Sequence, residues 1–376
     1  MDVVVTGIGL ISVLGNSLEL SWNRLLAGNS GIKLHQPYAE LPPVPLGLIH
    51  QRPVDLFDLT QQVVSAAVKD AGLKVPASEC GVVIGSSRAH QAEWERLAGV
   101  DTIPDSFINS LPHTLALSAA RQIGSSGPVL ATMAACATGI WALAQGFGLI
   151  QRGECQQVLA GAVEMPITPL TLAGFSQMGA LASTGCYPFD RHRQGLVLGE
   201  AGVVFVLESL QIAQQRQAKI YGKILGFGLT NDAFNAISPN PNGKMAAVAI
   251  KDCLYRSALS VKDINYIHLH GTGTILNDKF EANLIQKLFP FGVPVSSTKG
   301  ATGHTLGASG MLGAAFCLMA LQKDIAPPCV GLTTTEFELN IIQKAQHIAL
   351  QNVLCFGFGF GGQNAVISLS KFAENS

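Results

Sequence analysis

The sequence has few charged and few aromatic residues. Of its 376 residues, 13% are charged and 7% are aromatic, whereas 48% are hydrophobic, and the formal net charge is −1. A composition so poor in charge excludes a disordered chain and predicts a large buried core. The Lys and Arg residues are scattered and form no basic stripe, so we expect no nucleic-acid partner.

Long apolar runs and targeting signals are also missing. Polar residues interrupt each apolar run before it reaches the roughly 18 to 20 residues of a membrane helix. Residues 2–7 resemble a buried strand, which leaves no room for a signal peptide. We therefore expect a soluble, cytoplasmic protein with no membrane partner.

The chain has neither a CxxC pair nor a flexible linker. Its eight cysteines are irregularly spaced in a chain without a secretory signal, which predicts reduced thiols. No Pro/Gly/Ser-rich stretch or charge block divides the sequence, so we expect one compact unit.

Short apolar runs alternate with helical patterns along the chain. The predicted strands are Val3–Thr6, Gly81–Ile84, Val158–Ala162 and Val203–Leu207, and the predicted helices include Thr60–Ala71, Gly139–Gln151 and Lys244–Ala258. This alternation is typical of layered α/β proteins.

The two halves of the sequence resemble each other. A strand at Val129–Thr132 leads to Cys136 and then to a Gly/Ala-rich helix. A strand at Val293–Ser296 leads to His304 and then to a second such helix, Gly307–Leu321. Each half thus places one reactive side chain between a strand and a helix, which indicates an internal duplication.

Cys136 is a candidate nucleophile. It precedes a helix directly, where free N–H groups and the positive end of the helix dipole favour a thiolate. Buried cysteines are common, so this position alone does not decide between a structural and a catalytic role. The decision rests on its partners elsewhere in the chain.

His270 ends a predicted strand and enters a loop rich in Gly and Thr. Active sites of α/β sheets form at such strand ends. His268 lies two residues earlier on the same strand face, so a two-histidine metal site is the alternative. No carboxylate or cysteine at ligand spacing accompanies the pair, and we therefore expect no metal.

Two further segments carry candidate groups. Lys299 lies five residues before His304 among small residues, where a buried ammonium would have an electrostatic role. Phe356–Asn364 contains too many glycines for a regular strand. It is predicted to be either a tight turn or a mobile loop whose N–H groups point at an oxyanion and whose phenylalanine opens a pocket.

Together these segments resemble the β-ketoacyl-acyl-carrier-protein synthases, the elongating condensing enzymes of the thiolase superfamily. The resemblance extends to Val5–Gly9, Pro188–Arg191 and Gly199–Glu200. It implies an α/β thiolase-like fold with two similar βαβαβαββ halves in an α/β/α/β/α arrangement. The halves would be residues 1–220, with the nucleophile, and 221–376, with both histidines. It also implies a homodimer.

The resemblance implies specific roles for the candidate residues. Cys136 would accept the acyl group from the phosphopantetheine arm of acyl carrier protein, so no bound cofactor is expected. His270 and His304 would bind the malonyl thioester and assist loss of CO₂, with Lys299 supporting them. The remaining matches are an oxyanion hole from the N–H groups of Cys136 and Phe360, a gate at Phe360, and substrate-binding residues Thr272, Thr274 and Phe358.

The chemistry accounts for this set of groups. Thioester exchange needs a thiol nucleophile, and a malonyl group that loses CO₂ supplies its own carbanion. Two neutral imidazole donors then suffice for the enolate oxygen. Thiolases differ in needing a second cysteine, and initiating or chalcone-type synthases carry an asparagine in place of the second histidine.

The sequence departs from the family pattern at two places. Gly313 stands where relatives carry a glutamate near the lysine, and Glu200 and Asp278 are candidates to replace that charge. Ser86–Pro112 is shortened, although relatives use this stretch for the acyl pocket and the dimer contact. Two alternative functions stay open: a polyketide-type ketosynthase that works with a chain-length partner, and a non-condensing scaffold or decarboxylase subunit.

Overall fold

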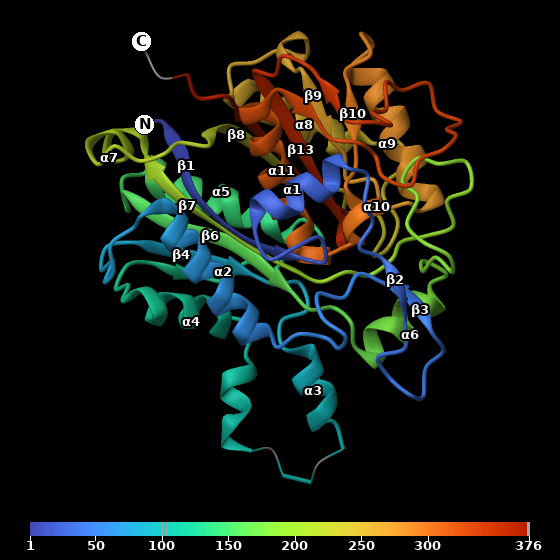
Figure 1. Cartoon of the computed structure of the whole chain (residues 1–376), viewed down its shortest axis with the longest axis horizontal. Coiled ribbons are helices and arrows are strands. Elements are labelled where there is room, and N and C mark those ends of the chain that lie inside the picture. Colours follow the sequence, from blue (N-terminus) through green and yellow to red (C-terminus); the bar gives the residue numbers. More distant parts are fainter. Residues whose placement is uncertain (100, 103, 374–376) are drawn as a thin grey trace.

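The computed structural model describes residues 1–99, 101–102 and 104–373. Ten strands form one large sheet (Figure 1), in the spatial order β10, β9, β13, β14, β8, β1, β7, β6, β4, β5. Their bounds are β1 Val3–Ser12, β4 Gly81–Gly85, β5 Val129–Leu130, β6 Gln157–Glu164, β7 Ala201–Ser209, β8 Gly222–Asn231, β9 Tyr266–His268, β10 Val295–Ser296, β13 Asn352–Gly359 and β14 Gln363–Ser370. The predicted strands appear as β1, β4, β6 and β7, which are longer than predicted, and as β5 and β10, which are shorter. The largest difference is at β1, which continues to Ser12 instead of ending at Thr6.

Helices and short hairpins complete the chain. The helices are α1 Leu18–Leu26, α2 Leu56–Ala71, α3 Gln91–Leu97, α4 Thr114–Ile123, α5 Thr138–Gln151, α6 Pro169–Gln177, α7 Leu210–Gln215, α8 Lys244–Arg256, α9 Ile275–Leu288, α10 Lys299–Thr302 and α11 Ser309–Lys323. Short 3₁₀ helices are η1 Asp105–Ser110, η2 Val261–Asp263, η3 Leu306–Ala308 and η4 Phe360–Gly362. Two small antiparallel pairs join β2 Lys33–His35 to β3 Val44–Leu46, and β11 Ile325–Ala326 to β12 Gln346–His347.

The two halves of the chain repeat one topology. The first runs β1, α2, β4, α4, β5, α5, β6, β7, and the second runs β8, α8, β9, α9, β10, α11, β13, β14. In each half four strands run in one direction, and the last strand, β7 or β14, runs antiparallel to its two neighbours. The two sets of strands join where Val3–Val5 of β1 pair with Gly222–Ile224 of β8. The predicted pair of βαβαβαββ units is therefore confirmed.

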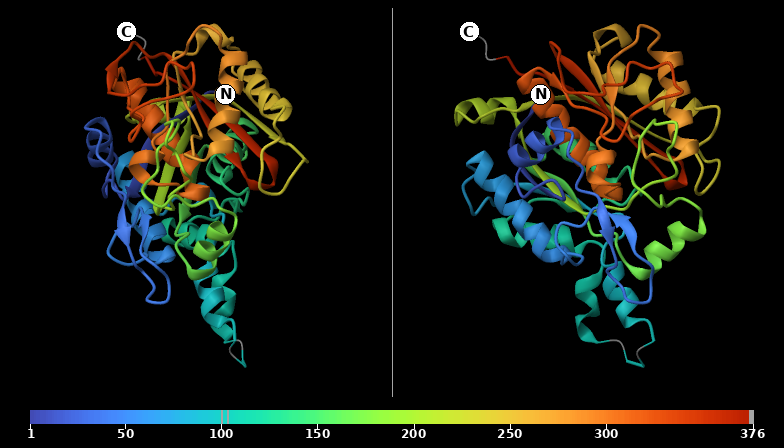
Figure 2. Two further views of the ribbon diagram at one scale, coloured as in Figure 1. Left: turned by 90° about the vertical axis from the view of Figure 1, so that its right-hand side faces the viewer. Right: turned by 45° about the vertical axis from the view of Figure 1, so that its right-hand side comes forward.

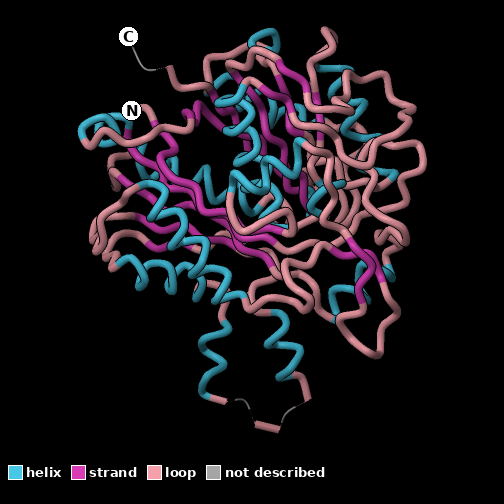
Figure 3. The backbone as a smooth tube through the Cα atoms, in the orientation of Figure 1, coloured by secondary structure: helices cyan, strands magenta, loops and turns pink. Residues whose placement is uncertain are grey.

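Helices form three layers around these strands, as the tube view shows (Figure 3). α2 packs on the outer face of the first set of strands and α8 on the outer face of the second. α5 and α11 contact each other and lie between the two sets. This α/β/α/β/α arrangement is the thiolase-like fold that the sequence predicted.

α11 supplies the apolar centre of the molecule. Every residue from Ser309 to Leu321 is buried. Among the described residues, one helical segment, Leu306–Lys323, is long and apolar enough to span a membrane, although the sequence pattern predicted none. Of this segment, 89% is buried inside the protein, so its apolar composition serves the core. All eight cysteines are free, as predicted.

Two segments differ from the sequence predictions in form. The glycine-rich Phe356–Gly359 is the end of regular strand β13, because each of its residues pairs with a residue of β14. The turn that the sequence predicted is confined to η4, where Gly361 and Gly362 have positive φ. The segment 86–112, which the family resemblance predicted to be shortened, has residues 100 and 103 outside the description; its helix α3 projects from the body (Figure 2).

Candidate active site

Cys136 and His304 occupy equivalent places in the two repeats. Cys136 lies between β5 and α5, and His304 lies between β10 and α11. A non-glycine residue with positive φ accompanies each: Ala135, at φ 47°, precedes the cysteine, and Leu306, at φ 39°, follows the histidine. Such backbone strain persists where the surroundings enforce it and is frequent at active sites.

The structure brings Cys136, His270 and His304 together from both halves. Their side-chain ligand atoms all lie within 4.8 Å of one another, and all three residues are buried. The two imidazole rings are 5.2 Å apart between centroids and nearly perpendicular. Two histidines and one thiol therefore converge on a single point, although they are far apart in the sequence.

Lys299 fixes the protonation pattern of His270. Its Nζ donates to the carbonyl oxygen of His270 and lies 3.4 Å from His270 Nδ1. Because an ammonium has only donors, Nδ1 must accept and Nε2 must carry the ring proton. A metal needs the lone pair of Nε2, so this contact favours a hydrogen-bond donor over a metal ligand at His270.

Ser309 contacts His304, the second histidine of the site. Its Oγ lies 2.9 Å from His304 Nδ1 and 3.2 Å from Thr305 Oγ1. Burial, with Lys299 as the second cause, holds the pKa of both His270 and His304 well below the usual value for histidine. Both rings are therefore neutral at neutral pH, as the chemistry of two imidazole donors requires.

Cys136 differs from its predicted protonation state. Burial raises the pKa of its thiol to about 11, although Lys299 and a hydrogen bond from the Phe360 N–H both lower it. α5 begins only at Thr138, two residues further on. Burial thus favours a thiol as the resting group and opposes the effect of the helix N-terminus, from which the sequence predicted a thiolate.

Two buried glutamates support the site, and sequence reasoning missed both. Glu281 accepts hydrogen bonds from the backbone N–H groups of His270 and Gly271 at 2.7 and 2.6 Å. It is also the carboxylate with the strongest favourable effect on the charge of Lys299. Burial raises the pKa of Glu281 to about 7. Acidic residues on the apolar face of α9, at Asp278 and Glu281, were the available sequence signal.

The candidates Glu200 and Asp278 do not replace the family's glutamate. Glu200 accepts from the backbone of Ile49 and Val54. Asp278 accepts from the backbone N–H groups of Phe189 at 2.7 Å and Gly273 at 3.2 Å. Both therefore bind backbone N–H groups, and Glu281 is the carboxylate that acts on Lys299.

Glu164 is the second missed glutamate. It ends β6 and accepts hydrogen bonds from Ser86, Ser87, Arg88 and Gly307. The carboxylate thus ties the loop after β4 to the turn that follows His304. Burial raises its pKa. Its partners are mainly backbone N–H groups, which carry no signature in a sequence.

Cys136 opens into a cavity of about 320 Å³ that also contains the remaining candidates. Thr272 and Thr274 line it, with their hydroxyl oxygens 2.8 Å apart. Phe358 packs edge-on against His270 at a centroid distance of 6.1 Å. Phe360 stacks on Phe175 at 5.8 Å. All eight residues predicted for the site therefore meet at this cavity or directly behind it.

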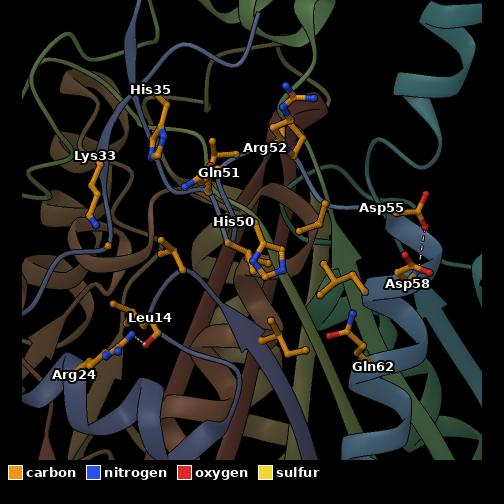
Figure 4. A pocket seen from close by; sticks show the side chains of 18 of the residues that line it. Leu14, Arg24, Lys33, His35, His50, Gln51, Arg52, Asp55, Asp58 and Gln62 are labelled. Atoms are coloured by element: carbon orange, nitrogen blue, oxygen red, sulfur yellow. Dashed lines mark hydrogen bonds between the residues drawn. The ribbon is translucent and has the colours of Figure 1, made fainter.

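A larger hollow of about 1150 Å³ lies elsewhere, between α1, β2 and the start of α2 (Figure 4). Its charged rim combines the cations Arg24, Lys33 and Arg52 with the acids Asp55 and Asp58. These charges nearly cancel, and none of the reactive residues lines the hollow. The chemistry therefore belongs to the smaller cavity.

Comparisons with known proteins agree with this geometry. Residues 51–213 match the family model "Beta-ketoacyl synthase, N-terminal domain" and residues 221–333 match "Beta-ketoacyl synthase, C-terminal domain". A 3-oxoacyl-[acyl-carrier-protein] synthase 2 of Staphylococcus aureus is 33% identical, with 98% of each chain covered.

Two solved structures are similarly close. One is the complex AntDE:AntF, described as a type II PKS acyl-carrier protein with its ketosynthase; it has a TM-score of 0.92 and 26% identity over 99% of both chains. The other is a β-ketoacyl synthase from Burkholderia phymatum, with a TM-score of 0.90 and 26% identity over 99% of this chain and 100% of that one. With these matches and the converging cysteine and histidines, the chain belongs to the β-ketoacyl synthase family of condensing enzymes.

Proposed function

We propose that the protein elongates acyl chains in fatty acid synthesis by decarboxylative condensation with malonyl-acyl carrier protein. The observation that carries this proposal is the convergence of Cys136, His270 and His304 within 4.8 Å. One thiol accepts an acyl group, and two neutral donors face the same point.

In the first step, Cys136 takes the acyl group from the carrier. Its Sγ forms a bond to the acyl carbon, the carrier thiol departs, and the cysteine proton leaves with it. The N–H groups of Cys136 and Phe360 would stabilise the tetrahedral oxyanion. Because the proton passes to the leaving thiol, a resting thiol with a raised pKa is compatible with this exchange.

In the second step, malonyl thioester replaces the free carrier. Its bond to the carboxylate breaks, CO₂ leaves, and the electron pair forms an enolate whose oxygen accepts from Nε2–H of His270 and from His304. The enolate carbon then attacks the acyl carbon and expels the Cys136 thiolate, which solvent reprotonates. No proton is removed from carbon, so no strong base is needed.

Acyl carrier protein is the partner that this chemistry requires. Four exposed apolar side chains line the mouth of the cavity: Met178, Ile237, Ile275 and Leu276, with exposed fractions of 38%, 49%, 59% and 65%. Exposed apolar groups gathered around one opening are typical of an interaction surface. We call these four residues the apolar rim, and it would receive the carrier while the arm reaches Thr272 and Thr274.

We also propose a homodimer formed through β5. This two-residue strand lies at the edge of the large sheet, and Val129 and Leu130 are each 38% exposed. An open edge with apolar side chains is a template for pairing with a second chain. A cytoplasmic location would suit the eight free cysteines.

The decisive experiment is reconstitution with purified carrier proteins. Acyl-carrier proteins of several chain lengths and malonyl-carrier protein are mixed with the enzyme, and the 3-oxoacyl product is measured by mass spectrometry. We expect product and CO₂ in equal amounts, and neither acyl transfer nor product with Cys136→Ala. CO₂ release without condensation at any chain length would instead support the decarboxylase alternative.

A polyketide-type ketosynthase is the second candidate, because the AntDE:AntF complex is among the closely similar structures. Such a protein would require a different chain as its partner. Condensation by the purified protein alone would contradict this candidate, whereas activity only after addition of a homologous subunit would support it.

A further inference from the structure

His268 is a buried histidine with no part in the reaction as described above. It is the last residue of β9, only 2% exposed, and lies beside Cys355 of β13 in the parallel ladder. Its Nε2 lies 3.1 Å from Thr298 Oγ1, and its Nδ1 lies 3.8 Å from Cys355 Sγ. Both ring nitrogens therefore face polar partners inside the core.

The neighbouring helix makes room for this ring. A Cβ on Gly313 of α11 would lie 2.7 Å from both Cε1 and Nδ1 of His268, and 2.9 Å from Cys355 Sγ. Glycine inside a helix is destabilising relative to alanine. Since the imidazole occupies the space that a side chain at 313 would need, Gly313 and His268 form a matched pair.

Thr298 connects His268 to the active site. It is the residue before α10, and its hydroxyl makes no capping bond to that helix, so it is available to His268. The carbonyl of Thr298 accepts from Ala301 and Thr302, which fixes the start of α10. Lys299 follows directly and donates to His270.

We propose that His268 is a positioning residue that acts through Thr298 to hold Lys299 against His270. The hydrogen bond from the ring to Thr298 sets the start of α10, and this sets where the Lys299 ammonium lies. The ammonium in turn keeps the proton of His270 on Nε2, where it faces the cavity. This proposal rests on the proposed function, because Nε2–H of His270 is the group that donates to the oxygen of the malonyl enolate.

The first test compares two nearly isosteric replacements. His268→Gln places an amide nitrogen near the position of Nε2 and keeps a bond to Thr298, whereas His268→Met fills similar space without one. We expect the glutamine variant to decarboxylate malonyl-carrier protein at close to the wild-type rate. We expect the methionine variant to be about tenfold slower, with acylation of Cys136 unchanged.

The second test removes the other partner. Thr298→Val should also slow decarboxylation about tenfold, and adding it to His268→Met should cost nothing more, because both changes remove the same bond. Equal rates for the glutamine and methionine variants, or multiplied losses in the double variant, would overturn the proposal. Equal losses of acylation and decarboxylation, together with a lower melting temperature, would show a merely structural role.

A spectroscopic readout separates this proposal from the proposed function. Histidine-selective ¹⁵N labelling reports which ring nitrogen of His270 carries the proton, without any substrate. We expect the Nε2–H form in the wild type and in His268→Gln, and a mixture of forms in His268→Met. An unchanged His270 tautomer in His268→Met rejects the positioning role, whereas a wild-type protein without condensation activity rejects only the proposed function.

Discussion

Removal of the Ser309 hydroxyl should slow the decarboxylation step selectively. Ser309→Ala deletes one oxygen atom, which lies 2.9 Å from Nδ1 of the fully buried His304. A buried polar atom without a partner costs about 1 to 3 kcal/mol. The entropy of unfolding is about 0.8 kcal/mol/K for 376 residues, so the melting temperature should fall by roughly 1 to 4 °C.

Removal of the Ser309 hydroxyl also frees the His304 ring to rotate away from the enolate. If the full 1 to 3 kcal/mol is lost in the transition state, the rate falls by roughly 5- to 150-fold. The assay measures CO₂ release from malonyl-carrier protein and, separately, acylation of Cys136 by mass spectrometry. Ser309→Thr, which keeps the hydroxyl, is the control. Wild-type CO₂ release by Ser309→Ala would refute the idea that Ser309 orients His304.

Three further predictions concern the rim, the histidines and the sheet edge. Ile275→Glu should raise the KM for carrier-bound substrate about tenfold or more, but leave a small thioester unaffected; Leu34→Glu, exposed on β2, is its control. Because the pKa of His270 and His304 lies well below 6.5, the acid limb of the decarboxylation rate should lie below pH 6.5. Lys299→Met removes a cation that lowers the pKa of both histidines, so the acid limb of the decarboxylation rate should move to higher pH. An acid limb at the wild-type pH would contradict this electrostatic effect of Lys299. Leu130→Asp should yield monomers by light scattering, whereas Leu34→Asp should not, and an unchanged dimer would exclude pairing through β5.

The reactive side chains could be predicted from the sequence, but their supports could not. Cys136, His270 and His304 each lie in a short segment whose strand, loop and helix pattern is local. Glu281 and Glu164 instead bind backbone N–H groups brought to them by distant parts of the chain. No local pattern encodes those partners, so two buried carboxylates central to the site went unnoticed.

Tertiary context also reversed two local preferences. Glycines in Phe356–Gly359 disfavour a strand, yet β14 pairs with every residue of the segment and supplies its partners. The position of Cys136 before a helix favours ionisation, yet burial of the thiol raises its pKa. In both cases a contact between distant segments outweighs the local rule.

Because the active site is divided between the two repeats, catalytic activity measures whether the repeats have assembled. The nucleophile comes from the first repeat and both histidines from the second. Among the strands that the structure describes, those of the two repeats pair only along Val3–Val5 and Gly222–Ile224. A chain cut between α7 and β8 would divide the reactive groups between two fragments. Neither fragment would contain a complete site, so recovered turnover on mixing would measure how well the halves recognise each other.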